Sequence, residues 1–469
     1  MTIRFVTLGC KLNFAESSAI GKTLLERGHV RARANEEADV CVVNTCSVTD
    51  VADHKGRQAI HKVRRENPNA VLIVTGCYAQ LKPQEISNIE GVDYVLGQDA
   101  KFKIPELVEQ IEKTSPTPQG APHYAHGLAG TPRQEGLKEQ LTTREMYPVS
   151  DMTTRAASSP KQSIVPPEFT ADIRTVDDFH GAYSRDDRTR CFLKVQDGCN
   201  YFCTYCTIPL ARGKSRNLSI AEVVTAAQQA IDEGAKEIVL TGVNIGDFGR
   251  STGERFIDLL RSLDTLQARE EGVGYRVRIS SCEPNLLSDE VIDFVAQSKH
   301  FAPHFHIPLQ SGSNEVLRIM HRRYTRELFE ERVTHIRQVM PNAFIGVDCM
   351  VGVRGENAEY FADYVAFIER LPVSRLHVFT YSERANTRML EMDLEVVPMA
   401  ERHRRSKMLH AISEQKLADF YAQHKGEKAV VLWESKREGD KMSGFTENYI
   451  RVTTPYDKKK VNTFEEIVL

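Results

Sequence analysis

The chain of 469 residues has no long hydrophobic run, since no stretch approaches the roughly 20 apolar residues that cross a bilayer. Its opening, MTIRFVTLGC, lacks the basic start, long apolar core and small-residue cleavage site of a signal peptide. We therefore expect a cytoplasmic protein without membrane association. Thiols stay reduced in that compartment, and clustered cysteines there bind metal more often than they form disulfides.

A strong charge excess is also missing, because the formal net charge is −3 at pH 7. No global field therefore draws the chain onto nucleic acid, but patches rather than sums decide phosphate binding. The segment 400–469 is mildly basic, with RHRRSK at 402–407 and KKK at 458–460. Such runs are most often solvated faces, so charge by itself assigns no partner.

The length predicts two or three domains, and residues 3–113 have the pattern of the first. Short β-rich runs alternate there with helical stretches, as in parallel strands joined by crossover helices. The predicted strands are IRFVTLG, ADVCVVNTC, AVLIVTGC and DYVLG. We expect an open α/β domain over 1–113. Eight of the chain's 19 prolines then fall in 114–184, which predicts a linker or surface insertion.

A second α/β pattern begins at Arg190 and contains six strand–helix repeats. The predicted strands are CFLKVQDG, KEIVLTGVN, YRVRISS, HFHIPLQ, FIGVDCMVG and RLHVFTYS. Six β/α repeats predict a partial barrel over 185–423, with the active site at the C-terminal ends of its strands. A long helix over 399–426 then leads into a β-rich tail at 424–469, which predicts a small antiparallel barrel or sheet. The expected fold class is α/β.

Three cysteines with C-x3-C-x2-C spacing follow the first strand of this barrel: Cys199, Cys203 and Cys206. A closed tetrahedral zinc site needs a fourth ligand. His304 and His306 exist, but their spacing does not mark them as ligands. A cubane iron–sulfur cluster held by three thiolates would instead keep one iron open for a substrate. Zinc and unrelated buried cysteines remain the alternatives.

A second trio is formed by Cys10, Cys46 and Cys77, each at the end of a predicted parallel strand of the first domain. The carboxyl ends of parallel strands meet at one edge of a sheet, where ligands typically bind. These thiols could therefore form one site. The alternative is ordinary burial, which cysteine favours and which suits Cys41 in mid-strand.

The C-x3-C-x2-C loop resembles that of the radical S-adenosylmethionine (SAM) superfamily. With the first trio and the tail, the chain resembles the methylthiotransferases of that superfamily over nearly its whole length, apart from 114–184. The tail resembles a TRAM domain, a small RNA-binding β module. The matching motifs are TLGCKLNFAES, NTCSVTDVAD, GCYAQ, GCNYFCTYCTIPLARG, LTGVNIGDFG, RISSCEP, IPLQSGSNEVLRIMHRRYT and GFTENYIRV.

The resemblance implies two [4Fe–4S] clusters and two roles for SAM, as methyl donor and as radical source. Cys199, Cys203 and Cys206 would hold the radical-generating cluster. The auxiliary cluster, which carries the sulfur on its open iron, would be held by Cys10, Cys46 and Cys77. The residues expected to contact SAM are Thr241, Gly242, Val243, Asn244, Ser280, Glu283 and Gln310.

TLGCKLN is most similar to the threonylcarbamoyladenosine tRNA branch of the family. The expected reaction is methylthiolation at C2 of N6-threonylcarbamoyladenosine beside the anticodon, at position 37, and the base must leave its stack for this. The alternatives are isopentenyladenosine in tRNA or an aspartate of ribosomal protein S12. The expected partners are tRNA and an electron donor such as flavodoxin or ferredoxin, and nothing demands more than a monomer.

Lysines and arginines near the C-terminus are candidates for phosphate contacts, which would supply most of the nonspecific affinity for RNA. They are Arg402, Arg404, Arg405, Lys407, Arg451 and Lys458. The chain departs from the family pattern at Val353 and Arg354, where relatives often have Phe-Pro, and at Asn386, where glycine is common. These departures weaken the substrate assignment and leave the cysteines untouched.

Two rival functions follow from the same residues. One is a radical SAM enzyme whose first cysteine trio is only structural, and iron counting separates it from two clusters. The other is a noncatalytic RNA-binding protein built on the tail, against which the complete C-x3-C-x2-C argues. The remaining cysteines, Cys191, Cys282 and Cys349, match no ligand spacing and are expected to be packing residues.

Overall fold

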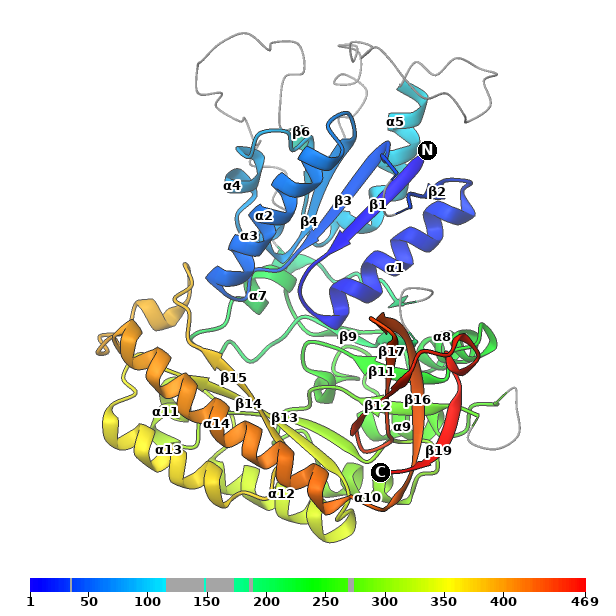
Figure 1. Cartoon of the computed structure of the whole chain (residues 1–469). Coiled ribbons are helices and arrows are strands. Elements are labelled where there is room, and N and C mark those ends of the chain that lie inside the picture. Colours follow the sequence, from blue (N-terminus) through cyan, green and yellow to red (C-terminus); the bar gives the residue numbers. More distant parts are fainter. Residues whose placement is uncertain (34–35, 115–146, 149–172, 185–188, 269–273) are drawn as a thin grey trace. The chain divides into compact units, whose positions relative to one another are not determined.

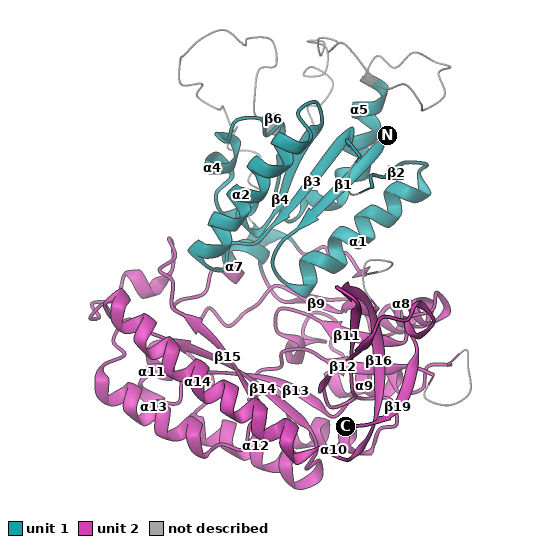
Figure 2. Cartoon of the chain, in the orientation of Figure 1, with its two compact units in different colours: residues 1–176, 210–213 teal, residues 177–209, 214–469 magenta. Residues whose placement is uncertain are grey.

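The described part of the chain divides into two units in this computed structural model (Figures 1 and 2). The structure describes residues 1–33, 36–114, 147–148, 173–184, 189–268 and 274–469. The first unit comprises 1–176 and 210–213, and the second comprises 177–209 and 214–469. The segment 210–213 thus belongs to the first unit, although it follows the three-cysteine loop in sequence.

The first unit is an open α/β sheet with the strand order β2-β1-β3-β4-β5-β6. The strands pair in parallel, except that β6 is antiparallel to β5. β3 and β4 are buried along their whole length, as expected for central strands covered on both faces. The strand bounds are β1 (Thr2–Thr7), β2 (Val30–Arg31), β3 (Val40–Thr45), β4 (Val71–Gly76), β5 (Tyr94–Leu96) and β6 (Tyr147–Pro148).

Helices cover this sheet and create a separate apolar cluster on each face. α1 and α5 pack on one face with Ile20, Leu24 and Leu107, and α2 packs on the other with Ile60. The helix bounds are α1 (Lys11–Glu26), α2 (Asp50–Glu66), α3 (Cys77–Leu81), α4 (Pro83–Ser87) and α5 (Ile104–Thr114). The open α/β architecture predicted for the first domain is confirmed.

The second unit contains six parallel strands in two adjoining sheets, β12-β11-β8-β7 and β13-β14-β15, with only β7 antiparallel. Parallel bridges from Val277 to Phe301 and from Ser281 to His306 link the sheets. The predicted partial barrel of six strands is therefore confirmed. Its strand bounds are β7 (Ala182–Tyr183), β8 (Arg190–Lys194), β11 (Glu237–Thr241), β12 (Arg276–Ile279), β13 (His304–Gln310), β14 (Phe344–Val351) and β15 (Arg375–Thr380).

The predicted first barrel strand ends earlier than expected, because the chain turns after Lys194. Residues Gln196–Asp197 form a separate short strand, β9, which pairs with β10 (Arg216–Asn217). The helices of this unit pack against one large apolar core. They are α7 (Ile208–Arg212, whose last turn lies in the first unit), α8 (Ile220–Asp232), α9 (Phe256–Leu263), α10 (Asp289–Gln297), α11 (Asn314–Ile319), α12 (Arg326–Val339), α13 (Ala358–Arg370) and α14 (Met399–Gln423).

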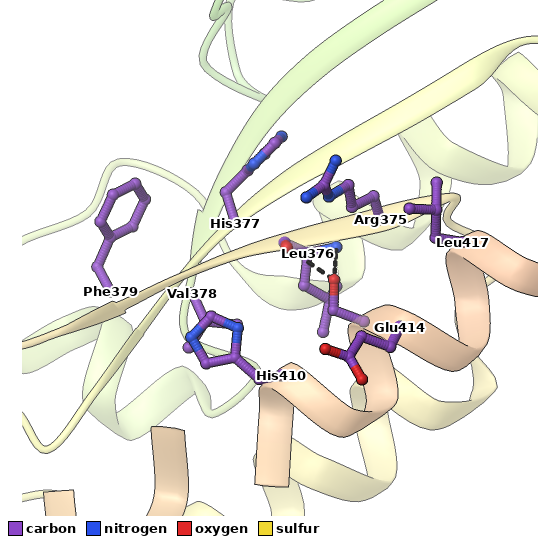
Figure 3. Close-up of a pocket in the computed structure, with 9 residues that line it drawn as sticks. Arg375, Leu376, His377, Val378, Phe379, His410, Glu414 and Leu417 are labelled. Carbon is purple, nitrogen blue, oxygen red and sulfur yellow. Dashed lines mark hydrogen bonds between the residues drawn. The ribbon is translucent and has the colours of Figure 1, made fainter. Parts of the chain in front are cut away.

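Helix α14 covers the open edge of β15, the last strand of its sheet. The Ser413 hydroxyl accepts from the Leu376 amide at 3.0 Å and donates to the Leu376 carbonyl at 2.8 Å. Figure 3 shows these bonds beside a hollow of about 290 Å³, with Arg375 and His377 on one side of the strand and His410 on the other. The helix thereby satisfies backbone groups that an edge strand would otherwise expose.

The C-terminal tail is a four-stranded antiparallel sheet with the order β18-β17-β16-β19. The predicted strand over 441–452 is two strands, because a turn around Tyr449, with φ 66°, reverses the chain. The bounds are β16 (Lys428–Glu438), β17 (Lys441–Phe445), β18 (Arg451–Pro455) and β19 (Phe464–Val468).

An arginine–glutamate network joins this C-terminal sheet to the barrel strands. The fully buried Glu237 of β11 pairs with Arg276 at 2.8 Å and Arg278 at 3.1 Å. Arg278 also donates to the carbonyl of Glu447, at 3.0 Å, in the turn before β18. The sheet is thus held by buried charges as well as by apolar contacts.

Most of the predicted linker at 114–184 lies outside the described residues. Its described parts include β6, which extends the first sheet, and β7, which pairs with β8. Among the residues that the structure describes, no helix is long and apolar enough to cross a membrane. The domain boundaries expected from the sequence stay predictions.

Candidate functional site

Cys199, Cys203 and Cys206 lie on one tight loop after β9. Gly198, with φ 71°, lets the chain leave the strand sharply. Backbone amides of Tyr201 and Ile208 donate to the sulfurs of Cys199 and Cys206 at 3.4 and 3.5 Å. Amides directed at sulfur stabilise thiolate ligands and tune the potential of a cluster.

The buried environment of these thiols favours their protonated form until a metal centre replaces the proton. Burial raises the pKa of Cys199 to about 12 and raises the pKa of Cys206 further. A thiolate at Cys203 would raise the pKa of both neighbours, which shows that the three sulfurs lie within electrostatic reach of one another. Binding a metal centre here therefore requires the release of protons.

Arg322 supplies a buried positive charge to this loop. Its side chain is 4% exposed, and its Nη1 donates to the Cys203 sulfur at 3.1 Å. Nη2 pairs with the carboxylate of Glu283, and Nε donates to the Tyr324 hydroxyl at 3.0 Å. Arg322 was not among the residues predicted for this site. The motif HRRYT contains two adjacent arginines, and no local pattern distinguishes Arg322 from Arg323 as the one that contacts a cysteine.

The residues expected to contact SAM lie at the C-terminal ends of β11, β12 and β13. The Ser280 hydroxyl is buried without a hydrogen-bond partner. The buried side chain of Asn244 interacts with the Tyr201 hydroxyl. Unsatisfied buried polar atoms are costly unless a ligand or water completes them. Ser280 therefore suits a polar ligand, as does the paired carboxylate of Glu283.

The other expected SAM contacts have internal roles. Gln196 Oε1 accepts from the amides of Val243 and Asn244, both at 2.9 Å, and their contact with SAM stays a prediction. Gly242 is required by the same packing, since a Cβ there would lie 2.9 Å from Gln196 Oε1. Thr241 donates its hydroxyl to the Val239 carbonyl.

Gln310 ends β13 with φ 65°, and its carbonyl accepts from Tyr364. Its side chain is partly exposed. The structure therefore gives this residue a backbone role in the turn after β13 and leaves its side chain available.

The second cysteine trio comes together at the C-terminal edge of the first sheet. Cys10 caps α1, Cys46 follows β3 directly, and Cys77 opens α3 after β4. A Cβ at Gly9 would lie 3.1 Å from the Cys46 sulfur, so the loops after β1 and β3 touch. The ends of β1, β3 and β4 therefore lie close together, as the sequence predicted for these parallel strands.

Electrostatics also places these three thiols near one another. Burial, together with the nearby Cys77 and Cys10, raises the pKa of Cys46 to about 12. Cys77 is buried, and its sulfur accepts from Gln98 Nε2 at 3.1 Å. Within the described residues, no three Cys, His, Asp or Glu side chains are arranged around a single ion. A cubane holds its thiolates farther apart than one ion does, so both trios fit a cluster by donor type.

The remaining cysteines are buried packing residues, as expected. Cys41, Cys191 and Cys349 lie within strands of the two cores. Cys282 follows β12, and its sulfur would lie 2.9 Å from a Cβ at Gly246. It therefore fills the space that this glycine leaves.

Two of the arginines expected to meet RNA are buried instead. Arg402 is 3% exposed and pairs with Glu383, and Arg405 is 4% exposed and pairs with Glu356 at 2.7 Å. The prediction of phosphate contact is wrong for both. Arg404, Lys407, Arg451 and Lys458 are exposed, although Arg404 pairs with Glu401 and Arg451 with Glu438.

Arg354, one of the departures from the family pattern, pairs with Glu383 at 3.0 Å. Asn386 adopts φ 64°, a conformation that glycine takes without strain and asparagine tolerates. Val353 is buried in a small apolar cluster with Tyr381 and Met389. All three departures are accommodated locally.

Family models match both units of this chain. Residues 2–97 match a model described as the uncharacterized protein family UPF0004, and residues 193–368 match the radical SAM superfamily. Among solved structures, the radical SAM methyltransferase TsrM from Kitasatospora setae, with cobalamin and a [4Fe–4S] cluster bound, has a TM-score of 0.51 at 16% identity. The alignment covers 81% of this chain and 72% of that one. This likeness shows the fold alone.

Curated relatives match over nearly the full length. The threonylcarbamoyladenosine tRNA methylthiotransferase of Bacillus subtilis is 36% identical over 96% of this chain and 90% of its own. That of Aquifex aeolicus is 31% identical over 96% of both. A tRNA-2-methylthio-N(6)-dimethylallyladenosine synthase of Bacteroides fragilis is 28% identical over 94% of this chain and 87% of its own. The chain belongs to the radical SAM methylthiotransferase family, in the branch of the threonylcarbamoyladenosine tRNA enzymes.

Proposed function

We propose that this protein adds a methylthio group to C2 of N6-threonylcarbamoyladenosine at position 37 of tRNA. The observation that carries the proposal is the near full-length similarity to threonylcarbamoyladenosine tRNA methylthiotransferases. Two cysteine trios support it, one at the ends of parallel strands of the first unit and one on the loop after β9. The lower identity to the dimethylallyladenosine enzyme ranks isopentenyladenosine as the alternative substrate.

The cofactors of this proposal are two [4Fe–4S] clusters and SAM. Cys199, Cys203 and Cys206 would hold one cluster, and Cys10, Cys46 and Cys77 the other. The chemistry available with both clusters bound is one-electron cleavage of SAM at the first and delivery of sulfur at the second.

Residues of the barrel would bind and orient SAM. The carboxylate of Glu283 and the guanidinium of Arg322 offer both signs of charge to an amino-acid moiety. Ser280 has a buried hydroxyl without a partner, which a polar ligand would complete, and Asn244 lies beside Tyr201 in the same turn region. Both charges lie beside Cys203, because Arg322 contacts its sulfur.

RNA binding is proposed for the C-terminal sheet, as a TRAM-like domain over 424–469. The exposed Lys458, in the turn between β18 and β19, carries positive charge in this domain, and so does Arg451 of β18, which pairs with Glu438. A cytoplasmic monomer with an electron donor such as flavodoxin or ferredoxin completes the proposal, because tRNA modification consumes electrons at the radical-generating cluster.

Nucleoside mass spectrometry of tRNA tests the proposal. Cells lacking this gene are complemented with wild type, Cys199→Ala, Cys10→Ala or Cys191→Ala, and digested tRNA is analysed. We expect 2-methylthio-N6-threonylcarbamoyladenosine with wild type and with Cys191→Ala, whose cysteine lies in the apolar core. Neither of the other variants should produce it.

Other substrates would appear in the same samples. A methylthio mass on isopentenyladenosine, or on ribosomal protein S12, with unmodified threonylcarbamoyladenosine would contradict the substrate assignment. Iron analysis of the purified protein adds a second check, because two cubanes require about eight irons per chain and one requires about four.

A further inference from the structure

A buried group of charges lies behind the cysteines of the first unit. Glu16, Lys101 and Arg212, here called the Glu16 cluster, are at most 1% exposed. Lys101 Nζ lies 2.5 Å from Glu16 Oε2, and Arg212 Nη1 lies 3.1 Å from Glu16 Oε1. One carboxylate is thus shared by two cations, in a setting where charge is expensive to bury.

The lysine arm of the Glu16 cluster reaches Cys77. Lys101 donates to Gln98 Oε1, and Gln98 Nε2 donates to the Cys77 sulfur at 3.1 Å. Since Lys101 holds the amide oxygen, Gln98 can present only its NH₂ group to the sulfur. The positive charge of Lys101 therefore orients the Gln98 amide so that its NH₂ group faces the Cys77 sulfur.

The arginine arm reaches the loops of the other two cysteines. Arg212 Nη2 donates to Asn13 Oδ1 at 2.7 Å, and the Cys10 sulfur lies 4.0 Å from the same oxygen. Asn13 Nδ2 donates to the carbonyls of Leu8 and Thr45, which precede Cys10 and Cys46 by two residues and one residue. One asparagine held by Arg212 therefore ties both loops.

The two cations and the carboxylate of the Glu16 cluster all lie behind the edge of the sheet that carries these cysteines. Lys101 is one amide away from the Cys77 sulfur, and Arg212 is one amide away from the Cys10 sulfur. Any species that adds negative charge at this edge of the sheet, whether a thiolate or a reduced cluster, is favoured by the two cations and opposed by the carboxylate.

We propose that Lys101 and Arg212 are positioning residues whose buried charge raises the reduction potential of the cluster held by Cys10, Cys46 and Cys77, with Glu16 as the opposing charge. The inference rests on the proposed function for the presence of that cluster. One electron added to the cluster adds one negative charge and breaks no bond. Each nearby positive charge therefore favours the reduced form.

Potentiometric titration of the full chain tests this. The parent protein carries Cys199→Ala, Cys203→Ala and Cys206→Ala, so that only the first-unit cluster is reconstituted. Dithionite supplies the electron, and the EPR signal of the reduced cluster is followed against potential. The variants are Lys101→Met, Glu16→Gln and the double variant Glu16→Gln/Lys101→Met, each checked for iron and sulfide.

The expected potentials follow net charge. Lys101→Met should favour the oxidised form about tenfold, which is about 59 mV lower for one electron. Glu16→Gln should raise the potential, and the double variant, which restores the net charge, should return close to the parent. A purely structural role predicts instead that the double variant, which loses the most contacts, departs furthest.

Any other order of the reduction potentials overturns the inference. A double variant displaced as far as Lys101→Met would do so, and so would a Glu16→Gln potential at or below the parent value. If Lys101→Met does not fold, the rise with Glu16→Gln still decides. A parent protein without iron would also contradict the inference, whereas tRNA methylthiolation by the intact chain tests the proposed function separately.

Discussion

Arg322 has more influence on the three-cysteine loop than any other charged side chain described there. It contacts the Cys203 sulfur, pairs with Glu283 and donates to Tyr324, all while 4% exposed. A guanidinium suits this position because its planar donors serve several acceptors at once. Lysine would offer one charge without the same fork.

Replacing Arg322 should destabilise the second unit. In Arg322→Met the buried carboxylate of Glu283 loses its partner, which costs about 3–5 kcal/mol for a buried pair. Urea unfolding of the cluster-free protein, followed by circular dichroism, should show the second unit unfolding at lower denaturant. The double variant Arg322→Met/Glu283→Gln should recover part of the loss. Equal stability of wild type and Arg322→Met would contradict this pairing.

The positions of the cysteines in the fold were easier to predict from the sequence than the contacts between charged residues. Cys10, Cys46 and Cys77 each follow a run with β-branched residues, so their places at strand ends could be predicted from the local sequence. Glu16, Lys101 and Arg212 are separated by 85 and 111 residues. Their partnership depends on the tertiary fold, and no local pattern announces it.

The error over Arg402 and Arg405 has a simple helical reason. These residues lie three apart on α14, on the face that also carries Leu409 and Phe420. That spacing is the apolar stripe of a helix packed on a core. The run RHRRSK was interpreted by its charge, whereas its periodicity indicated that two of its arginines point inward.

At the scale of elements, α14 protects the edge of β15 through a single hydroxyl. Ser413→Ala would leave the amide and carbonyl of Leu376 without their partner, at a cost of about 1–3 kcal/mol. Amide hydrogen exchange at Leu376 should accelerate, and thermal unfolding of the second unit should begin earlier. The control Ser406→Ala, on the same helix, should change stability by less than about 0.5 kcal/mol. Unchanged exchange at Leu376 would show that the hydroxyl is dispensable.

The long strands could be predicted almost completely, whereas the two-residue strands β2, β6, β7 and β10 were not predicted. Five of the six barrel strands coincide with apolar runs seen in the sequence, because buried parallel strands need such runs. The break after Lys194 and the turn at Tyr449 were missed. Both depend on non-glycine turn residues or tertiary pairing, and neither leaves a strong local signal.

At the scale of the whole molecule, the C-terminal sheet depends on the ionised form of Glu237. Burial favours its neutral form, but Arg278 and Arg276 outweigh burial and lower its pKa to about 2. A lowered pKa contributes stability above the unfolded value near 4.5, and that stability is lost as pH falls toward 2. Acid should therefore loosen the sheet from the barrel.

Trp433 reports this loosening, since it is the only tryptophan and lies in β16. Its fluorescence, followed from pH 7 to pH 2, should change in the wild type mainly below pH 4.5. Glu237→Gln should already be destabilised at pH 7, by about 3–5 kcal/mol, because two buried arginines lose their counter-charge. A variant as stable as wild type at pH 7 would argue against the network.

The side chain of Gln196 has a consequence for protein engineering. Its oxygen accepts from the turn after β11, and its nitrogen donates to the carbonyl of Gly198 at 2.7 Å, at the root of the cysteine loop. Gln196 thus hydrogen-bonds both the cysteine loop and the turn after β11, although it belongs to neither. A chimera that transplants only the segment from Gly198 to Cys206 into another barrel would leave this fastening behind. The graft must include Gln196 and a recipient turn whose two amides meet it.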